Sequence, residues 1–324
     1  MSVVLSCTDL RIEIDGRPVV DGTSLSIAAG ETLALVGESG CGKSMTALGL
    51  IRLLPDVARQ TGGRIDLQGD RLDTLPERRM NRLRGDRLAM IFQEPVASLD
   101  PLMPVGRQIA EALSRDRSLT HPAVNARVLD MLVRVGIDRP EVRARQYPFQ
   151  LSGGMCQRVM IAMAMIRRPT LLIADEPTTA LDVTIQKQIL ELMADLRQET
   201  KSAVLLITHD MGVVSESADR VAVMYAGRIV ETGTVAQVFA APRHPYTAML
   251  LRTIPRLDRP RKVALPAIAG AVPDIRNWPD GCRFHPRCPL ATDRCRTDTP
   301  PLAPVASGHQ TACWHHDRIA TELT

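Results

Sequence analysis

The sequence contains few aromatic residues: four Phe, three Tyr and two Trp in 324 residues. So few aromatic side chains argue against a surface that stacks the bases of single-stranded nucleic acid. The sequence also lacks any apolar run near the roughly 20 residues needed to cross a bilayer. Its first residues, MSVVLSCTDL, lack the basic and apolar parts of a secretory signal. We therefore expect a globular cytoplasmic protein with no membrane span and no nucleic-acid partner.

The apolar segments predict an α/β fold. Residues 10–14 and 24–27 alternate between apolar and polar around an Asp15-Gly16 turn, a pattern typical of an antiparallel hairpin. Continuous apolar strands are expected at 32–36, 171–175 and 203–207, with a helix over 185–200 between the last two. A strand, helix and strand in that order predict a parallel sheet. Residues from about 97 to 165 are expected to be mostly helical.

The composition changes near residue 241. The last 84 residues hold 12 of the 23 prolines and four of the seven cysteines, with little periodic patterning. We therefore predict one large domain over 1–240 and a separate, small, Cys-rich C-terminal module over 241–324.

A phosphate-binding loop is the first motif that carries chemistry. The run GESGCGKS matches GxxxxGKS and lies between an expected strand and an expected helix. Backbone NH groups of such a loop ring the phosphates, while Lys43 reaches the outer phosphates and Ser44 ligates magnesium. The alternative is an idle glycine-rich turn. The candidate nucleotide-binding residues here are Gly37, Glu38, Ser39, Gly40, Cys41, Gly42, Lys43, Ser44 and Met45.

Two acidic residues, Asp175 and Glu176, end the apolar strand LLIAD. The carboxyl ends of parallel strands are where ligands bind. We expect Asp175 to hold magnesium and Glu176 to orient or deprotonate a water that attacks the γ-phosphate. The alternative is that both acids merely cap the strand.

The run LSGGM, followed by an expected helix over 156–167, offers a second anion site in the same chain. LSGG followed by LLIADEPTTALD resembles the signature and Walker B motifs of the ABC ATPase family. The resemblance implies a P-loop NTPase fold with a RecA-like core, an antiparallel β subdomain and a helical subdomain at about 97–165. It also implies that Ser152, Gly153 and Gly154 face the γ-phosphate of an ATP held by a second ABC ATPase subunit.

Three further positions match family motifs. By resemblance, Gln93 in IFQEP reaches magnesium and the attacking water and links the site to membrane subunits. Asp182 in TTALD matches the D-loop, and His209 in LITHD matches the switch histidine that contacts the γ-phosphate. The resemblance therefore implies Glu176, His209 and Gln93 as catalytic residues, with Ser44, Gln93 and Asp175 around magnesium.

Two positions depart from the common family pattern. The fifth signature residue is Met155 rather than the usual glutamine, a variant shared by peptide-importer subunits. The position that often stacks an aromatic ring on adenine is Ile14, so we expect apolar base contact, aided by Val19.

The tail, with RHPYT and GCRFHPRCPLATDRC, resembles the C-terminal region of ABC ATPases of the peptide, opine and nickel importers. This resemblance implies an ATPase that energises uptake of dipeptides or short oligopeptides from the cytoplasmic face of the inner membrane. The implied partners are a related ATPase subunit, two transmembrane permeases and a periplasmic or extracellular substrate-binding protein. The alternatives are a nickel or other small-solute importer, an exporter ATPase, and a soluble ABC ATPase acting on nucleic acid or the ribosome.

Four cysteines, Cys282, Cys288, Cys295 and Cys313, lie in the tail with 5, 6 and 17 residues between them. Cytoplasmic thiols are seldom paired as disulfides. No gap is as short as the two to four residues typical of zinc sites, so the spacing favours an iron-sulfur cluster. Zinc and free thiols are the alternatives, and the resemblance implies a [4Fe-4S] cluster. Arginines beside the ligands are expected to offset the thiolate charge: Arg283, Arg287, Arg294 and Arg296.

Overall fold

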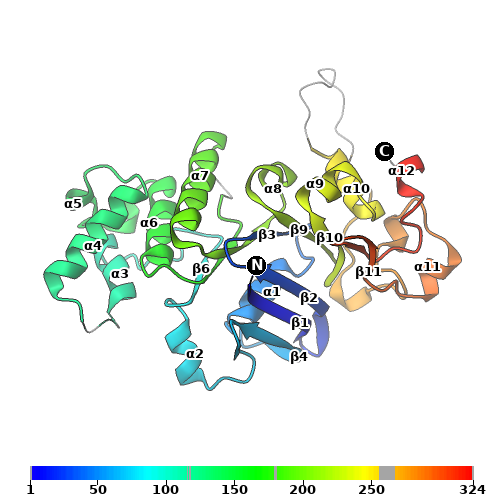
Figure 1. Ribbon diagram of the computed structural model, residues 1–324, viewed down its shortest axis with the longest axis horizontal. Helices are drawn as coiled ribbons and strands as arrows, with labels where there is room; N and C mark the ends of the chain where they lie inside the picture. The colour runs from blue at the N-terminus through cyan, green and yellow to red at the C-terminus, as the bar shows by residue number, and fades with distance from the viewer. Residues whose placement is uncertain (1, 115, 117, 179–180, 255–266, 323–324) are drawn as a thin grey trace. The chain divides into compact units, whose positions relative to one another are not determined.

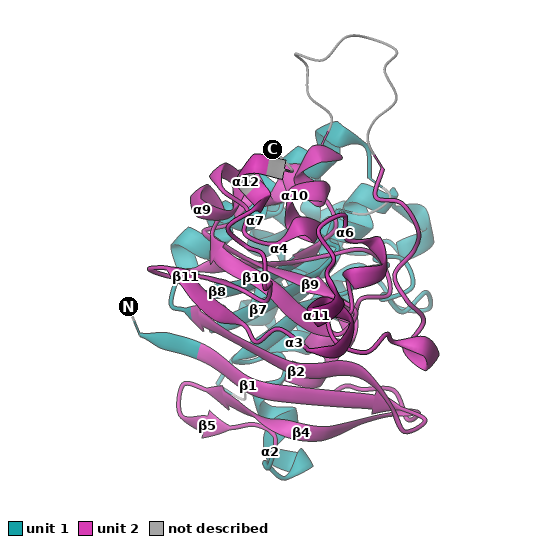
Figure 2. Cartoon of the chain, turned by 90° about the vertical axis from the view of Figure 1, so that its right-hand side faces the viewer, with its two compact units in different colours: residues 1–4, 28–30, 74–206 teal, residues 5–27, 31–73, 207–324 magenta. Residues whose placement is uncertain are grey.

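The computed structural model describes residues 2–114, 116, 118–178, 181–254 and 267–322. The chain divides into two compact units (Figure 2). Unit 1 comprises residues 1–4, 28–30 and 74–206, and unit 2 comprises residues 5–27, 31–73 and 207–324. Within the described ranges, no helix is long and apolar enough to cross a membrane.

Unit 1 is built mainly of helices, together with short strands. The strands β6 and β7 pair in parallel, and β8, at whose end the unit boundary falls, is the neighbour of β7. Its elements are α2 (Glu77–Leu83), β6 (Leu88–Ile91), α3 (Val105–Leu113), α4 (His121–Arg134), α5 (Pro140–Arg143), a 3-10 turn (Pro148–Gln150), α6 (Gly153–Met165), β7 (Leu171–Asp175), α7 (Val183–Thr200) and β8 (Ala203–Thr208).

The helices α3 to α6 gather in one part of unit 1 (Figure 1). In α4 the apolar residues recur at three- and four-residue spacing, so Val128, Met131 and Leu132 are buried on one face. The helix α3 packs against both α4 and α6. The sequence prediction of a helical stretch between about 97 and 165 is therefore confirmed.

Unit 2 begins with an antiparallel sheet in the order β2, β1, β4, β5. Asp15 and Gly16 both have positive φ, 50° and 73°, which suits the two-residue turn that joins β1 to β2. The predicted hairpin is thus confirmed. The strands are β1 (Val3–Ile14), β2 (Arg17–Ala28), β4 (Ala58–Leu67) and β5 (Asp70–Arg71).

The second sheet of unit 2 has the order β11, β12, β10, β9, β3. The strand β3, whose five residues are all buried, pairs in parallel with β9, and the remaining pairs are antiparallel. The elements are β3 (Thr32–Val36), α1 (Lys43–Leu50), α8 (Met211–Ser217), β9 (Arg220–Tyr225), β10 (Arg228–Thr234), α9 (Val235–Ala240), α10 (Pro245–Arg252), 3-10 turns (Ile275–Asn277 and His285–Arg287), α11 (Asp293–Thr297), β11 (Ala303–Ala306), β12 (His309–Thr311) and α12 (Ile319–Glu322).

The tail is part of unit 2 and does not form a free-standing module. Thr311 of β12 pairs with Glu231 of β10, so the tail extends a sheet that begins before residue 241. The expectation of a separate Cys-rich module is therefore not supported, because the backbone of β10 needs a neighbouring strand that the tail supplies. The boundary between residues 240 and 241 stays a prediction, and residues 255–266 of the tail lie outside the described part.

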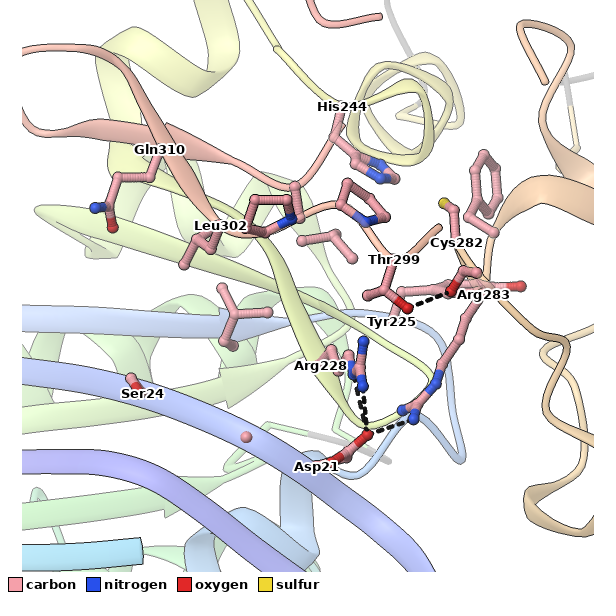
Figure 3. A pocket seen from close by; sticks show the side chains of 18 of the residues that line it. Asp21, Ser24, Tyr225, Arg228, His244, Cys282, Arg283, Thr299, Leu302 and Gln310 are labelled. Atoms are coloured by element: carbon pink, nitrogen blue, oxygen red, sulfur yellow. Dashed lines mark hydrogen bonds and ion pairs between the residues drawn. The ribbon is translucent and has the colours of Figure 1, made fainter. Parts of the chain in front are cut away.

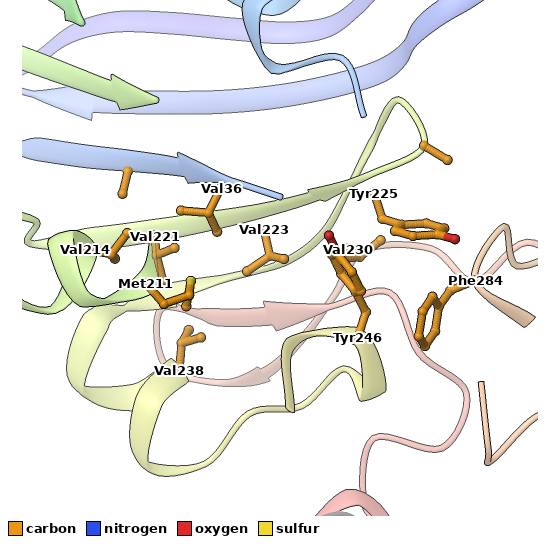
Figure 4. Packing of buried hydrophobic residues seen from close by; sticks show 12 residues of the cluster. Val36, Met211, Val214, Val221, Val223, Tyr225, Val230, Val238, Tyr246 and Phe284 are labelled. Atoms are coloured by element: carbon orange, nitrogen blue, oxygen red, sulfur yellow. The ribbon is translucent and has the colours of Figure 1, made fainter. Parts of the chain in front are cut away.

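A cluster of buried residues joins the tail to β9 and β3 (Figure 4). Three of the chain's few aromatic residues meet there: Tyr225 from β9, Tyr246 from α10 and Phe284 from the tail. Their ring centroids lie 4.7 to 5.3 Å apart in edge-on or tilted pairs. Such pairs add roughly 0.5–1.5 kcal/mol each beyond their buried area. The aromatic residues therefore fix the tail beside the strand that pairs with β3.

Candidate functional site

The glycine-rich loop runs from the end of β3 to the start of α1, within unit 2, as the sequence predicts. Gly42 lies at φ 107°, and a Cβ there would approach the Val19 carbonyl oxygen to 2.8 Å. A Cβ on Gly37 would come within 2.2 Å of the Met224 carbonyl oxygen. A side chain at either position would collide with a backbone carbonyl oxygen, so the tight curl of the loop requires glycine there. The loop leads into α1, and the first NH groups of a helix have no partner within the helix.

Lys43 is 5% exposed and lies over its own loop. Its Nζ donates to the carbonyl oxygens of Gly37 at 2.8 Å and Glu38 at 3.1 Å. Cys41 is also buried, and burial raises the pKa of its thiol, so the thiol stays protonated. The ammonium group is therefore held at the centre of the loop, where the phosphates of a nucleotide are expected.

In unit 1, the structure brings together two of the predicted catalytic residues. Gln93 Nε2 donates to Glu176 Oε2 at 3.0 Å. Glu176 has φ 46°, a left-handed conformation that costs a residue with a side chain about 1 kcal/mol or more. Asp175, one residue earlier, ends the fully buried β7 and is itself 5% exposed. Strain and a carboxylate–amide contact at the end of a parallel strand are features of a functional site.

The signature motif forms the N-terminus of α6 in unit 1. Ser152 is the N-cap, and its side-chain oxygen accepts a hydrogen bond from the Met155 NH group at 3.3 Å. Gly153 has open space where a Cβ would be, while a Cβ on Gly154 would approach Ile185 Cγ2 to 3.2 Å. Ser152 and Gly153 are exposed, so this helix end offers NH groups on the surface of the unit.

Asp182 and His209 lie at element ends, as the sequence predicts. Asp182 is the N-cap of α7, where its carboxylate accepts from the Ile185 NH group at 3.0 Å. His209 follows directly after β8 and is exposed. Ile14 ends β1, and Val19 is 7% exposed in β2. The functional roles of these residues remain predictions.

Sequence reasoning missed two tail residues that contact the phosphate loop. Tyr246 accepts a hydrogen bond from the Glu38 NH group at 2.8 Å, and Arg287 pairs with the Glu38 carboxylate. The run RHPYT indicates a resemblance to the C-terminal region of peptide-importer ATPases, but nothing in it indicates which loop Tyr246 contacts. The expectation that Arg287 offsets thiolate charge is wrong, because its guanidinium donates to the Glu38 carboxylate.

The four tail cysteines line one small cavity. Burial raises the pKa of Cys288 to about 11 and of Cys313 to about 12, so these thiols are protonated at neutral pH. Four thiols at one cavity suit the donor set of a cluster. In the described residues, however, no three His, Cys, Asp or Glu side chains group closely enough to hold a metal ion. The iron-sulfur cluster is therefore not supported by the structure.

Unit 2 also contains a cavity of about 680 Å³ between β2, β10 and the tail (Figure 3). Asp21 on its wall accepts hydrogen bonds from Arg228 at 2.8 Å and from Arg283. Burial alone would raise the pKa of Asp21, but the two guanidinium groups lower it below its usual range. Arg283, also expected to face the cysteines, stacks on Trp278 and ties the tail to β2.

Two family models match the chain. The ABC transporter model matches residues 20–179, which include the glycine-rich loop, the signature and the Asp175-Glu176 pair. The model of the oligopeptide/dipeptide transporter C-terminal region matches residues 230–295, which include RHPYT and three of the four tail cysteines.

Similar proteins match the chain along almost its whole length. A probable peptide ABC transporter ATP-binding protein of Sinorhizobium fredii is 48% identical over 98% of this chain and 96% of that protein. The oligopeptide transport ATP-binding protein AppD of Bacillus subtilis is 48% identical over 99% of both chains. The dipeptide transport ATP-binding protein DppD of Escherichia coli is 48% identical over 91% of this chain and 90% of that one.

Solved structures share the fold. CbiO1 of Clostridium perfringens, part of an ABC transporter complex, is 26% identical and covers 74% of this chain at a TM-score of 0.64. The ATP-binding cassette MJ0796, in a dimeric post-hydrolysis state with ADP and phosphate, matches with the same TM-score at 24% identity over 71% of this chain. Taken with the motifs and the relatives above, these matches mean that the chain belongs to the ATP-binding proteins of ABC transporters, which are ATPases.

Proposed function

We propose that this chain is the ATP-hydrolysing subunit of an importer for dipeptides or short oligopeptides. The observation that carries the substrate class is the tail, since residues 230–295 match the C-terminal region of oligopeptide and dipeptide transporters. Relatives named for peptide transport at 48% identity support the same substrate class. The ATPase activity itself depends on the motifs in residues 37–209.

The site residues supply positioning and proton transfer for hydrolysis. Lys43 and the NH groups of the glycine-rich loop bind the phosphates, and Glu176 accepts a proton from, or orients, the attacking water. The Gln93 amide, 3.0 Å from Glu176, holds that carboxylate in place. His209 is proposed to contact the γ-phosphate. No residue forms a covalent intermediate in this scheme.

Magnesium fits the donor set of three proposed ligands: the Ser44 hydroxyl, the Gln93 amide oxygen and the Asp175 carboxylate. Hard oxygen ligands of this kind are what Mg²⁺ prefers. When bound, the ion neutralises charge that develops on the phosphates. Asp175, buried at the end of β7, is the anionic member of the set.

The proposed working unit contains two ATPase subunits. The exposed N-terminus of α6 presents Ser152 and Gly153, which we assign to the γ-phosphate of an ATP held by the second subunit, together with Gly154 and the nearby Asp182. The other proposed partners are two transmembrane permeases and a substrate-binding protein. The assembly would hold this chain peripherally at the cytoplasmic face of the membrane.

Disrupting the gene in its own host should abolish growth on a dipeptide as the sole source of a required amino acid. The reason is that the permeases cannot be driven without this ATPase. The measurement is growth and uptake of labelled dipeptide, with restoration by the intact gene as the control. Normal peptide uptake together with lost nickel uptake would replace the peptide proposal by a metal importer.

The finer proposal is a [4Fe-4S] cluster held by Cys282, Cys288, Cys295 and Cys313. The proposal rests on the four thiols that line one cavity and on the spacing of these cysteines along the chain. Protein purified without oxygen should be brown, contain about four irons per chain, and lose its visible absorption with dithionite and in Cys288→Ser. Cys7→Ser, at a buried cysteine in β1, is the matched control and should stay brown. Colourless protein with stoichiometric zinc would contradict the cluster.

A further inference from the structure

Glu38 is the second residue of the glycine-rich loop. Its NH group, its carbonyl oxygen and its carboxylate each form hydrogen bonds. Its NH group donates to the Tyr246 hydroxyl at 2.8 Å. Its carbonyl oxygen accepts from Lys43 Nζ at 3.1 Å and from the Cys41 NH group at 3.3 Å. Its carboxylate accepts from two nitrogens of Arg287, at 2.6 and 3.0 Å. Glu38 therefore links the loop to two residues of the tail, to Tyr246 through its NH group and to Arg287 through its carboxylate.

Tyr246 is held in place by hydrogen bonds of neighbouring residues in the tail and on β10. The His244 imidazole Nδ1 accepts from the Tyr246 NH group at 3.1 Å, and Pro245 begins α10 between them. Glu231, fully buried on β10, accepts from the His244 NH group at 2.9 Å. Tyr246 itself is fully buried, and burial raises the pKa of its hydroxyl, which stays un-ionised. The run RHPYT therefore positions the Tyr246 hydroxyl so that it accepts a hydrogen bond from the Glu38 NH group.

Arg287 is equally anchored. Its side chain is 6% exposed, and its Nε donates to the Ala269 carbonyl oxygen at 2.8 Å. Burial alone would lower the pKa of Arg287, but the hydrogen bonds to Glu38 and Tyr225 raise it, so the guanidinium stays charged. A bidentate pair with a buried arginine is stronger and more directional than a surface ion pair.

We propose that Tyr246 and Arg287 are positioning residues that hold the glycine-rich loop in the curvature that receives the phosphates of ATP. The inference builds on the proposed nucleotide site and adds two residues, 208 and 249 positions away from Glu38, to it. In this proposal Tyr246 and Arg287 act through Glu38, with which both form hydrogen bonds. A loop that already has its phosphate-binding conformation loses less conformational entropy when ATP binds, so the affinity for ATP is higher. Removing either one should weaken binding of MgATP more than it lowers the turnover rate.

The test compares two isosteric variants on the same helix. Tyr246→Phe removes only the hydroxyl that accepts from the Glu38 NH group. Thr247→Val removes the neighbouring hydroxyl, whose oxygen is buried and has no hydrogen-bond partner within the described part of the chain. The dissociation constant for MgATP, measured on the full chain, should rise about fivefold in Tyr246→Phe and stay within about twofold in Thr247→Val. In the assembled transporter, the KM for ATP should rise likewise while kcat stays within about twofold.

A second set of three variants tests the ion pair between Arg287 and Glu38. Arg287→Met should raise the MgATP dissociation constant about tenfold. Arg287→Lys should raise it less, since a lysine can still form one charge-assisted hydrogen bond with Glu38. Arg283→Met, which removes another, half-buried arginine of the tail that pairs with Asp21 instead, is the matched control and should leave the MgATP affinity unchanged. Melting temperatures of all variants report any loss of stability separately from affinity.

Two results separate the inference from the nucleotide site on which it rests. If Tyr246→Phe and Arg287→Met melt earlier but bind MgATP as the unmodified chain does, the tail only stabilises the fold and the positioning role is wrong. Lys43→Ala serves as the reference for the site itself. If Lys43→Ala also binds MgATP normally, the proposed nucleotide site fails, and with it the basis for any positioning residue.

Discussion

Replacing Glu176 by Gln should lower the ATP hydrolysis rate of the assembled transporter at least about 100-fold, because a general base contributes 10²- to 10⁴-fold. Binding of MgATP should persist, since the substituted amide is the same size and still accepts from Gln93. Hydrolysis would be measured by phosphate release and binding by equilibrium titration. With hydrolysis blocked, two ATPase subunits should stay closed around ATP and elute together on size-exclusion chromatography.

The matched control is Glu191→Gln, the same change at an exposed position on α7, where Glu191 lies 3.9 Å from Lys187 in an ion pair. Its hydrolysis rate should be unchanged. Full activity in Glu176→Gln would remove Glu176 from the role of base. Loss of MgATP binding in that variant would instead point to a structural role for the strained residue at φ 46°.

Replacing Lys43 by Ala should weaken MgATP binding about 50-fold and abolish hydrolysis. Two effects add: the variant loses charge-assisted hydrogen bonds to phosphate, and it also loses the bonds to the carbonyl oxygens of Gly37 and Glu38 that hold the loop. Titration of the full chain with MgATP, followed by phosphate release in the assembly, measures both.

Lys187→Ala is the control for loss of a lysine, because Lys187 is 71% exposed and far along the chain from the loop. It should bind MgATP as the unmodified protein does. Lys43→Arg keeps the charge but changes its shape, and we expect it to bind better than Lys43→Ala while hydrolysing poorly. Normal affinity in Lys43→Ala would mean that the glycine-rich loop does not bind the phosphates.

Features encoded by neighbouring residues could be predicted from the sequence. The Asp15-Gly16 turn, the strand before the glycine-rich loop and the helix after LSGG each depend on local backbone preferences. The order of the motifs along the chain sufficed to recognise the ABC ATPase family. The helical segment over α3 to α6 was also visible, because the apolar spacing of α4 is strong.

Features that depend on contacts between residues far apart in the chain could not be predicted from the sequence. The pairing of β12 with β10 involves two short strands about 80 residues apart, and neither carries a pattern that names its partner. The contact of Arg287 with Glu38 likewise pairs a cysteine-flanking arginine with a loop glutamate 249 positions earlier. Sequence reasoning assigned Arg287 and Arg283 to their nearest anions along the chain, the cysteines, whereas the fold gives them Glu38 and Asp21.

The most direct test of the central claim is peptide uptake by the assembly in vesicles. This chain, its second ATPase subunit and the two permeases would be reconstituted, with the substrate-binding protein and labelled dipeptide added on one side and MgATP on the other. The account predicts dipeptide accumulation that requires ATP and ceases in Glu176→Gln. Steady ATP hydrolysis without any peptide accumulation, or uptake that continues in Glu176→Gln, would contradict it.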